Sequence, residues 1–135
     1  MTTKEFEIYL ESIGGLENGH FPDRPAIVKN LCECDDGWLQ IIADLIAELI
    51  AAGWDKQICQ IKEKFGGLRF YINSGSEEIH DIISKYESLS YETCEVCGEA
   101  GELRKDTGWK GGMWYKTMCD KHYNELKEER KDGYK

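Results

Sequence analysis

Four potential metal ligands occur as two pairs in the last third of the chain. Cys94 and Cys97 form a C-x-x-C pair followed by Gly98, and Cys119 and His122 form a C-x-x-H pair. Thiolate sulfur and imidazole nitrogen are the ligands that zinc prefers, and four of them complete a tetrahedral site. The spacing therefore predicts one structural zinc ion per chain, with no coordination position left for a catalytic water.

The segment that carries these ligands is expected to need the metal. Residues 94–135 contain few apolar side chains and many glycines, so they cannot form a hydrophobic core of their own. We expect a hairpin from strands within 103–105 and 113–118, and a helix that begins near Thr117 and continues over 123–131. Together with the C-x-x-C turn, these elements predict a treble-clef-like or zinc-ribbon-like finger.

The three other cysteines show no comparable pattern. Cys32 and Cys34 are separated by one residue, Cys59 is distant in sequence, and only His20 offers a further ligand nearby. A second metal site is therefore the alternative to free, buried thiols. The N-terminus lacks the basic and apolar regions of a secretory signal, and cytosolic thiols stay reduced. We expect metal binding rather than disulfides, in a soluble, cytoplasmic protein.

Length and charge restrict the function further. The 135 residues fit one domain with a small appended part. The net charge is -9, and residues 1–55 are the most acidic part, with 3 basic against 11 acidic side chains. Broad capture of nucleic acid needs basic surface, so it is not expected. The longest apolar stretch, residues 38–54, is interrupted by polar and charged side chains, so no membrane span is predicted.

The elements before the ligands are predicted from hydrophobic periodicity. Apolar residues follow the helical period over 3–13 and over 38–52. The second helix has the wider apolar face and is expected to be the central core helix. Asp35 or Asp36 would cap its N-terminus, and Gly53 would end it.

Two strands and a third helix follow. Residues 56–65 and 68–73 alternate as strands, and Gly66-Gly67 can take the positive φ angles of a two-residue turn. The third helix runs to about Ser90, with a capping box expected between Ser74 and Glu77.

Two further predictions concern residues 16–37 and the fold class of the whole chain. Residues 16–37 contain both prolines and are predicted to form an irregular loop. Helix, hairpin and helix predict an α+β core over residues 1–93, followed by the finger over residues 94–135.

The predicted hairpin concentrates positive charge in an acidic chain. Lys62 and Lys64 share one face of the first strand, and Arg69 and Tyr71 share the outward face of the second. These four side chains could bind a phosphate, a carboxylate or an acidic loop of a partner. The aromatic side chains of the finger hairpin are a second candidate surface because such residues anchor interfaces. They include Trp109 and Trp114.

Enzyme classes that use similar metal sites do not fit. A nuclease of the His-Me type would place a histidine within the finger hairpin, and none lies between Cys97 and Cys119. A zinc deaminase needs an H-x-E motif, which the chain does not contain. A RING domain needs eight interleaved ligands, and only four are well placed here. No P-loop or G-x-S-x-G motif occurs. We therefore predict a non-enzymatic protein with no catalytic residue.

Three motifs carry a resemblance to a protein family. They are I-K-E-K-F-G-G-L-R-F-Y at 61–71, T-C-E-V-C-G at 93–98 and T-M-C-D-K-H at 117–122. The chain resembles, over roughly residues 36–125, small uncharacterised proteins of bacteria and of their phages and prophages. That family has no assigned activity, so the resemblance implies the zinc ligands and the hairpin but no catalytic role. It also implies an accessory or counter-defence function in the cytoplasm of a bacterial host.

These observations lead to one main hypothesis and two alternatives. The main hypothesis is a zinc-stabilised interaction module that binds a host protein through the acidic N-terminal region or the finger aromatics, with inhibition of that protein as one possible consequence. The first alternative is a binder of a small anionic ligand or nucleotide that uses the hairpin cations. The second is a nucleic-acid-binding finger, which is weaker because residues 94–135 carry no net charge.

Overall fold

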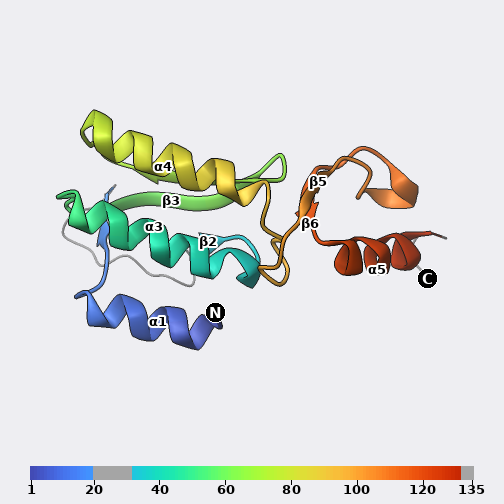
Figure 1. Cartoon of the computed structure of the whole chain (residues 1–135), viewed down its shortest axis with the longest axis horizontal. Coiled ribbons are helices and arrows are strands. Elements are labelled where there is room, and N and C mark those ends of the chain that lie inside the picture. Colours follow the sequence, from blue (N-terminus) through green and yellow to red (C-terminus); the bar gives the residue numbers. More distant parts are fainter. Residues whose placement is uncertain (20–31, 132–135) are drawn as a thin grey trace.

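The computed structural model describes residues 1–19 and 32–131, which form an elongated α+β structure (Figure 1). The helices α1, α3 and α4 and the larger sheet make up the core at one end, and β5, β6 and α5 make up the C-terminal segment at the other. The elements in chain order are α1 (Thr3–Ser12), β1 (Glu17–Asn18), β2 (Cys32–Glu33), the 3-10 helix η1 (Asp36–Trp38), α3 (Leu39–Ala51), β3 (Gln57–Lys64), β4 (Gly67–Ile72), α4 (Glu77–Ser90), β5 (Glu102–Arg104), the 3-10 helix η2 (Trp109–Gly111), β6 (Lys116–Met118) and α5 (Asp120–Arg130).

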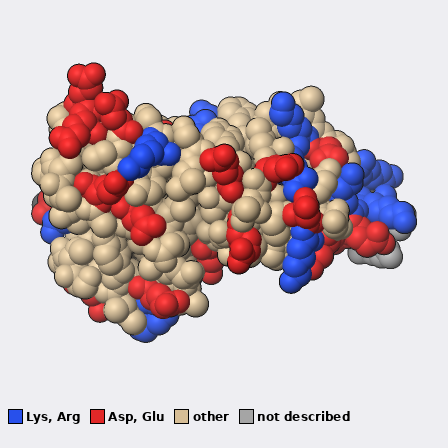
Figure 2. Space-filling view, in the orientation of Figure 1, with Lys and Arg blue, Asp and Glu red and all other residues tan. Residues whose placement is uncertain are grey.

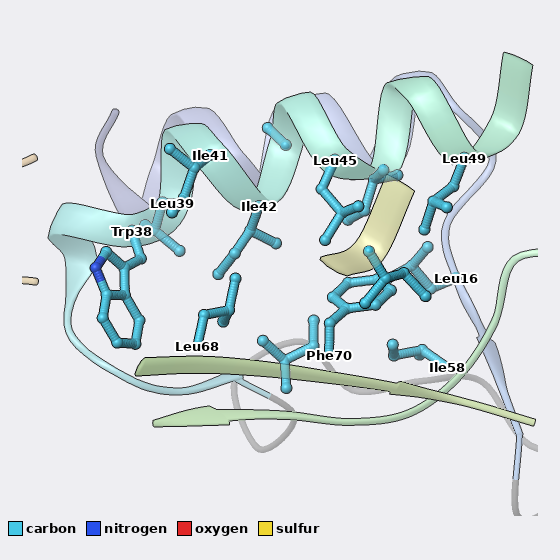
Figure 3. Packing of buried hydrophobic residues seen from close by; sticks show 14 of the residues in the cluster. Leu16, Trp38, Leu39, Ile41, Ile42, Leu45, Leu49, Ile58, Leu68 and Phe70 are labelled. Atoms are coloured by element: carbon cyan, nitrogen blue, oxygen red, sulfur yellow. The ribbon is translucent and has the colours of Figure 1, made fainter. Parts of the chain in front are cut away.

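Helix α3 is the central core helix, as its wide apolar face predicts. Its inward side chains pack on the sheet residues Ile58, Leu68 and Phe70 (Figure 3). Complete burial of each such side chain contributes roughly 1.5–3 kcal/mol, so this helix dominates the stability of the core. The side chains that α3 buries are Leu39, Ile41, Ile42, Ala43, Leu45, Ile46 and Leu49.

The C-terminal end of α3 agrees with the prediction, but the N-terminal end does not. Gly53 has φ +94° and follows the last turn, as a helix stop should. The predicted aspartate cap is wrong, because the helix is entered through η1 without a side-chain cap. Asp36 instead accepts a hydrogen bond from Thr3 of α1, and Asp35 forms an ion pair with Lys116. Both carboxylates therefore connect elements that are distant in sequence.

The larger sheet is built around β3. Strand β4 pairs with it in antiparallel fashion, and the two short strands β1 and β2 both run parallel to it. Because β4 occupies one edge of β3, β1 and β2 lie one after the other along the opposite edge. The prediction of an irregular loop over residues 16–37 is therefore wrong for β1 and β2. Residues 20–31, with both prolines and His20, lie outside the described part.

The hairpin turn lies one residue earlier than predicted. Phe65 and Gly66 have φ +53° and +84°, whereas Gly67 is already part of β4 and pairs with Lys64. The physical reason is the Tyr91 ring, which would lie 2.2 Å from a Cβ atom at Gly67. Glycine is needed there for close packing, so the less common left-handed conformation falls on Phe65.

Helix α4 packs beside α3 and along the free edge of β4. Its N-cap is Ser76, whose side chain accepts from the Ile79 amide, so the capping box predicted at Ser74 is wrong. Two side chains in the last turns of α4 accept hydrogen bonds from backbone amides of β4, which is an edge strand. Ser90 accepts from the Leu68 amide, and Glu87 accepts from the Phe70 amide. The edge of β4 is therefore closed to pairing with another strand.

No helix in the part of the chain that the structure describes is long and apolar enough to cross a membrane.

Candidate functional site

The structure brings the four predicted metal ligands together. The ligand atoms of Cys94, Cys97, Cys119 and His122 all lie within 4.8 Å of one another, and no other cluster of this kind occurs in residues 1–19 and 32–131. The sulfur atoms of Cys97 and Cys119 are 3.8 Å apart, and the same distance joins the Cys94 sulfur to His122 Nδ1. A tetrahedron with metal–sulfur bonds of about 2.3 Å has edges of about 3.8 Å. The four residues therefore fit one metal ion.

The first ligand pair lies on a tight turn. The Gly98 amide donates to the Cys94 carbonyl at 2.9 Å, and Gly98 has φ +83°, which closes the turn after the second thiol. Burial opposes a thiolate at Cys94, but hydrogen bonds from the backbone at Cys119, Cys97 and Val96 outweigh it and lower the pKa of this thiol. In the same turn, burial and the neighbouring Cys94 and Cys119 raise the pKa of the Cys97 thiol to about 11, so a bound cation would be needed to hold both as thiolates at neutral pH.

The second ligand pair lies at the start of α5. Cys119 is the N-cap of this helix, and its sulfur accepts from the His122 amide at 3.5 Å. The predicted start of the helix near Thr117 is wrong, because residues 116–118 form β6 and pair with β5. Cys119 and His122 nevertheless share the first helical turn, so their ligand atoms converge, with Sγ and Nδ1 only 3.2 Å apart.

The C-terminal segment has almost no apolar core. Among its described residues, Cys94 and Met118 are the buried apolar side chains, and α5 has no buried residue. The helix is held to the hairpin by polar contacts: the Tyr123 hydroxyl donates to Asp106 at 2.8 Å, and the Arg104 guanidinium lies 4.3 Å from the Tyr123 ring. Such contacts are too weak to hold a helix alone, so an ion bound by both ligand pairs would add a connection between the helix and the rest of the segment.

The ligand turn is packed directly on the core. The Gly37 amide donates to the Glu95 carbonyl at 2.7 Å, and the Trp38 indole donates to the Thr93 carbonyl at 2.9 Å. A Cβ atom at Gly37 would lie 2.3 Å from the Cys94 carbonyl oxygen. The entrance to α3 therefore touches the first metal ligand, which the sequence does not indicate.

A buried carboxylate lies at the same junction. The Glu95 side chain is 4 % exposed and forms an ion pair with Lys116 at 3.3 Å, while also accepting from the Asp35 amide at 2.9 Å. Burial raises the pKa of Glu95, and the two nearby carboxylates raise the pKa of Lys116 despite its own burial. Charge pairing thus connects the two parts of the molecule in addition to the backbone hydrogen bonds.

The hairpin cations are only partly available for a ligand. Lys62 and Arg69 are direct cross-strand partners. The Arg69 guanidinium already donates to the Leu68 carbonyl and the Tyr91 hydroxyl, and the Lys62 ammonium lies 5.8 Å from the Tyr71 ring. Lys62, Arg69 and Tyr71 line neither the apolar groove nor the polar pocket described below, whereas Lys64 lines the groove.

An apolar groove lies where the core hairpin meets the C-terminal segment. It has a volume of about 450 Å³. Phe65 projects from the β3–β4 turn at 66 % exposure, and its ring lies 6.5 Å from that of Tyr115. Met113 and Trp114 are 82 % and 63 % exposed. The lining residues, which we call the aromatic groove, are Glu63, Lys64, Phe65, Met113, Trp114 and Tyr115.

The sequence identifies only part of this groove. Trp114 and Lys64 were expected at a partner surface, and both line it. Trp109 is 49 % exposed on η2 and does not line it. Phe65 has no functional signal in the sequence beyond a large apolar side chain at a predicted turn, where polar residues are usual. A second pocket, of about 610 Å³, lies between η2 and α5, and most of the side chains that line it are polar or charged.

The remaining thiols differ from the metal cluster. Cys32 and Cys34 are half-buried in or beside β2, and burial raises the pKa of Cys32 to about 12 and that of Cys34 further still. Cys59 lies on β3, next to β1. His20, the fourth partner considered for a second metal site, lies outside the described residues.

These thiols should be slow to alkylate. At pH 8 a thiol with a pKa near 12 is almost entirely protonated, and only the thiolate reacts. In the metal-loaded protein we expect iodoacetamide to modify Cys32 at least about a hundredfold more slowly than a free cysteine. Mass spectrometry of peptides over a time course measures this rate, with guanidinium-unfolded protein as the control. Rapid modification of Cys32 in the folded protein would contradict its burial.

Comparison of the chain with protein-family models, with curated proteins and with solved structures found no match, so the function has to be argued from the geometry above.

Proposed function

We propose that this protein is a non-enzymatic interaction module, stabilised by one structural zinc ion, that binds a partner protein through the aromatic groove. Zinc is supported by the ligand set of three thiols and one imidazole and by ligand separations that suit a tetrahedron. Four side-chain ligands leave no position for a reacting water or substrate. This supports a structural ion and a protein that acts by binding.

The C-terminal segment is proposed to be a treble-clef-like finger. It begins with the Cys94–Gly98 turn, continues through the hairpin of β5 and β6, and ends in α5, whose first turn carries the second ligand pair. In this arrangement the ion fixes the hairpin between the two ligand pairs. Because Trp114 and Tyr115 directly precede β6, the ion also fixes one wall of the aromatic groove.

The single observation that carries the proposal is the exposure of this groove. Monomeric proteins rarely expose neighbouring large apolar side chains, and such patches usually mark interfaces. Both walls are held rigidly, because the buried Thr117 hydroxyl donates to the Gly66 carbonyl at 2.6 Å across the two hairpins. A rigid aromatic surface loses little conformational entropy on binding. The resemblance to phage and prophage proteins supports a protein of the bacterial host as the partner.

Substitution of Trp114 tests the proposal. Trp114→Ala should reduce capture of the partner from a bacterial lysate about tenfold or more, because exposed tryptophans at interface centres are frequent hot spots. The measurement is quantitative mass spectrometry of proteins that co-purify with the tagged chain. The fold should be retained, since the Trp114 backbone, and not its side chain, bonds to Lys105 and Thr107.

Trp109→Ala is the matched control, because Trp109 is also an exposed tryptophan of the same segment but lies outside the groove. It should leave capture within about twofold of the wild type. If both variants capture the same proteins as the wild type, the groove is not the binding surface and the proposal is wrong.

A further inference from the structure

The charge around the aromatic groove points to the chemistry of its partner. The Lys64 ammonium lies 5.7 Å from the Phe65 ring, and the Lys105 ammonium lies 5.8 Å from the Tyr115 ring. Lys64 and Lys105 are both exposed; Lys64 lines the groove, and Lys105 lies beside its Tyr115 ring. In a chain with a net charge of -9, the aromatic groove is therefore bordered by two cations.

One acidic side chain, Glu63, also lines the groove, so Glu63, Lys64 and Lys105 together leave a net charge of +1 there. The Glu63 carboxylate accepts from the Gly66 amide at 2.6 Å and so closes the β3–β4 turn. Two carboxylates of the C-terminal segment have partners away from the groove: Asp106 accepts from Tyr123 and pairs with Lys127, and Asp120 pairs with Arg104. Figure 2 shows many acidic side chains over the core half and basic side chains concentrated toward the end formed by the C-terminal segment.

The lining of the groove selects against nucleic acid. Phosphate backbones need an extended basic surface, and the strongly acidic core would repel them. The groove is instead lined by three exposed apolar side chains, with Lys64 in its lining and Lys105 beside its Tyr115 ring. A volume of about 450 Å³ is in the range of a pocket for a few side chains. A partner segment that has both an apolar side chain and carboxylates would complement the apolar lining and the two lysines.

We infer that the aromatic groove binds an acidic peptide segment of its partner, in which an apolar anchor residue is flanked by aspartate or glutamate. This inference rests on the proposed function and specifies its partner. The anchor packs between Phe65 and Trp114, and the flanking carboxylates reach Lys64 and Lys105. Because the charges are exposed, they determine selectivity and association rate more than affinity.

Selection of peptides from a random display library tests the inference. The baits are the zinc-loaded wild-type chain and the charge-reversed variant Lys64→Glu/Lys105→Glu. The wild type should enrich peptides with acidic residues around an aromatic or large aliphatic residue. The reversed bait should enrich basic residues around the same kind of anchor, because the apolar lining is unchanged.

Binding of the selected acidic peptide is then measured by fluorescence polarisation. The reversed variant should bind it at least about tenfold more weakly, and salt should weaken wild-type binding. Lys4→Glu/Lys110→Glu is the matched control, because it makes the same change in net charge at exposed lysines outside the groove. It should bind within about twofold of the wild type.

Other outcomes overturn the inference in distinguishable ways. Enrichment of neutral or basic peptides by the wild type would contradict the acidic partner but leave the groove as a binding surface. Tight binding of single-stranded oligonucleotides, or a dimer that Trp114→Ala dissociates, would assign the groove to nucleic acid or to a second copy of the chain. No enrichment, together with lysate capture unaffected by Trp114→Ala, would remove the proposed function as well.

Discussion

Cys97→Ser should abolish metal binding and unfold the C-terminal segment. Cys97 is exposed, and replacing an exposed side chain normally changes stability by no more than about 0.5 kcal/mol. A structural zinc ion contributes about 10–16 kcal/mol of apparent binding free energy, and a weaker oxygen donor in place of a thiolate removes a large share of it. We expect a loss of affinity greater than the roughly 10–100-fold that changes outside the ligand shell produce. The zinc content measured by elemental analysis should fall from one ion per chain to nearly none.

Hydrogen exchange locates the unfolding. Amides of residues 94–131 should lose protection in Cys97→Ser and in the chelated wild type, because the segment has little apolar core. The core should largely remain, with one exception: the Gly37 and Trp38 contacts to Glu95 and Thr93 should open as well. The core is therefore expected to stay folded except where it contacts the ligand turn.

Cys59→Ser is the control for this experiment, because Cys59 is a half-buried thiol outside the cluster. It should retain one zinc per chain and native exchange. Full zinc content in Cys97→Ser, or unchanged exchange after chelation, would show that the cluster is not a structural metal site.

Gly37→Ala should strongly destabilise the protein. Its Cβ atom would lie 2.3 Å from the Cys94 carbonyl oxygen and 2.4 Å from that of Glu95. Both atoms belong to the backbone of the ligand turn, so no side-chain rotation relieves the contact. We expect a loss of about 3 kcal/mol or more in the free energy of unfolding, at the upper end for added volume in packed interiors. Urea unfolding followed by tryptophan fluorescence measures it.

The position of the clash gives this variant a second expected effect. Separation of Gly37 from the ligand turn should lower zinc affinity although Gly37 is not a ligand, because the turn would lose its support on the core. A competition assay with a chromophoric chelator measures this change.

Gly112→Ala is the matched control, because a Cβ atom there would meet only the Trp109 carbonyl oxygen, at 3.1 Å. This variant should lower the free energy of unfolding by less than about 1 kcal/mol. Equal stability of the two variants would mean that the ligand turn does not pack on Gly37 as described.

Local patterns in the sequence were sufficient for most elements and for the metal ligands. The helical period of residues 38–52 predicts α3, and the alternation of Leu68 and Phe70 predicts the buried face of β4. These signals are reliable because they depend on residues within a few positions of one another. The two ligand pairs are recognisable for the same reason: each pair lies within one turn of backbone, and its chemistry is specific to metals.

Contacts between distant residues decided the rest. Gly67 is needed against Tyr91, which moves the hairpin turn to Phe65 and exposes that ring beside Tyr115. The aspartates before α3 look like caps, but they bond instead to Thr3 and Lys116. The short strands β1 and β2 form only because β3 offers a free edge to pair with.

The sequence by itself therefore determined the α+β class and which four side chains can hold an ion, because both follow from spacing along the chain. Only the tertiary structure decided where the C-terminal segment rests on the core and which aromatic side chains stay exposed. The packing of the Glu95 backbone on Gly37 and the bond from Thr117 to Gly66 join residues far apart in sequence. The aromatic groove exists because these contacts hold two hairpins side by side, an arrangement that no local period encodes.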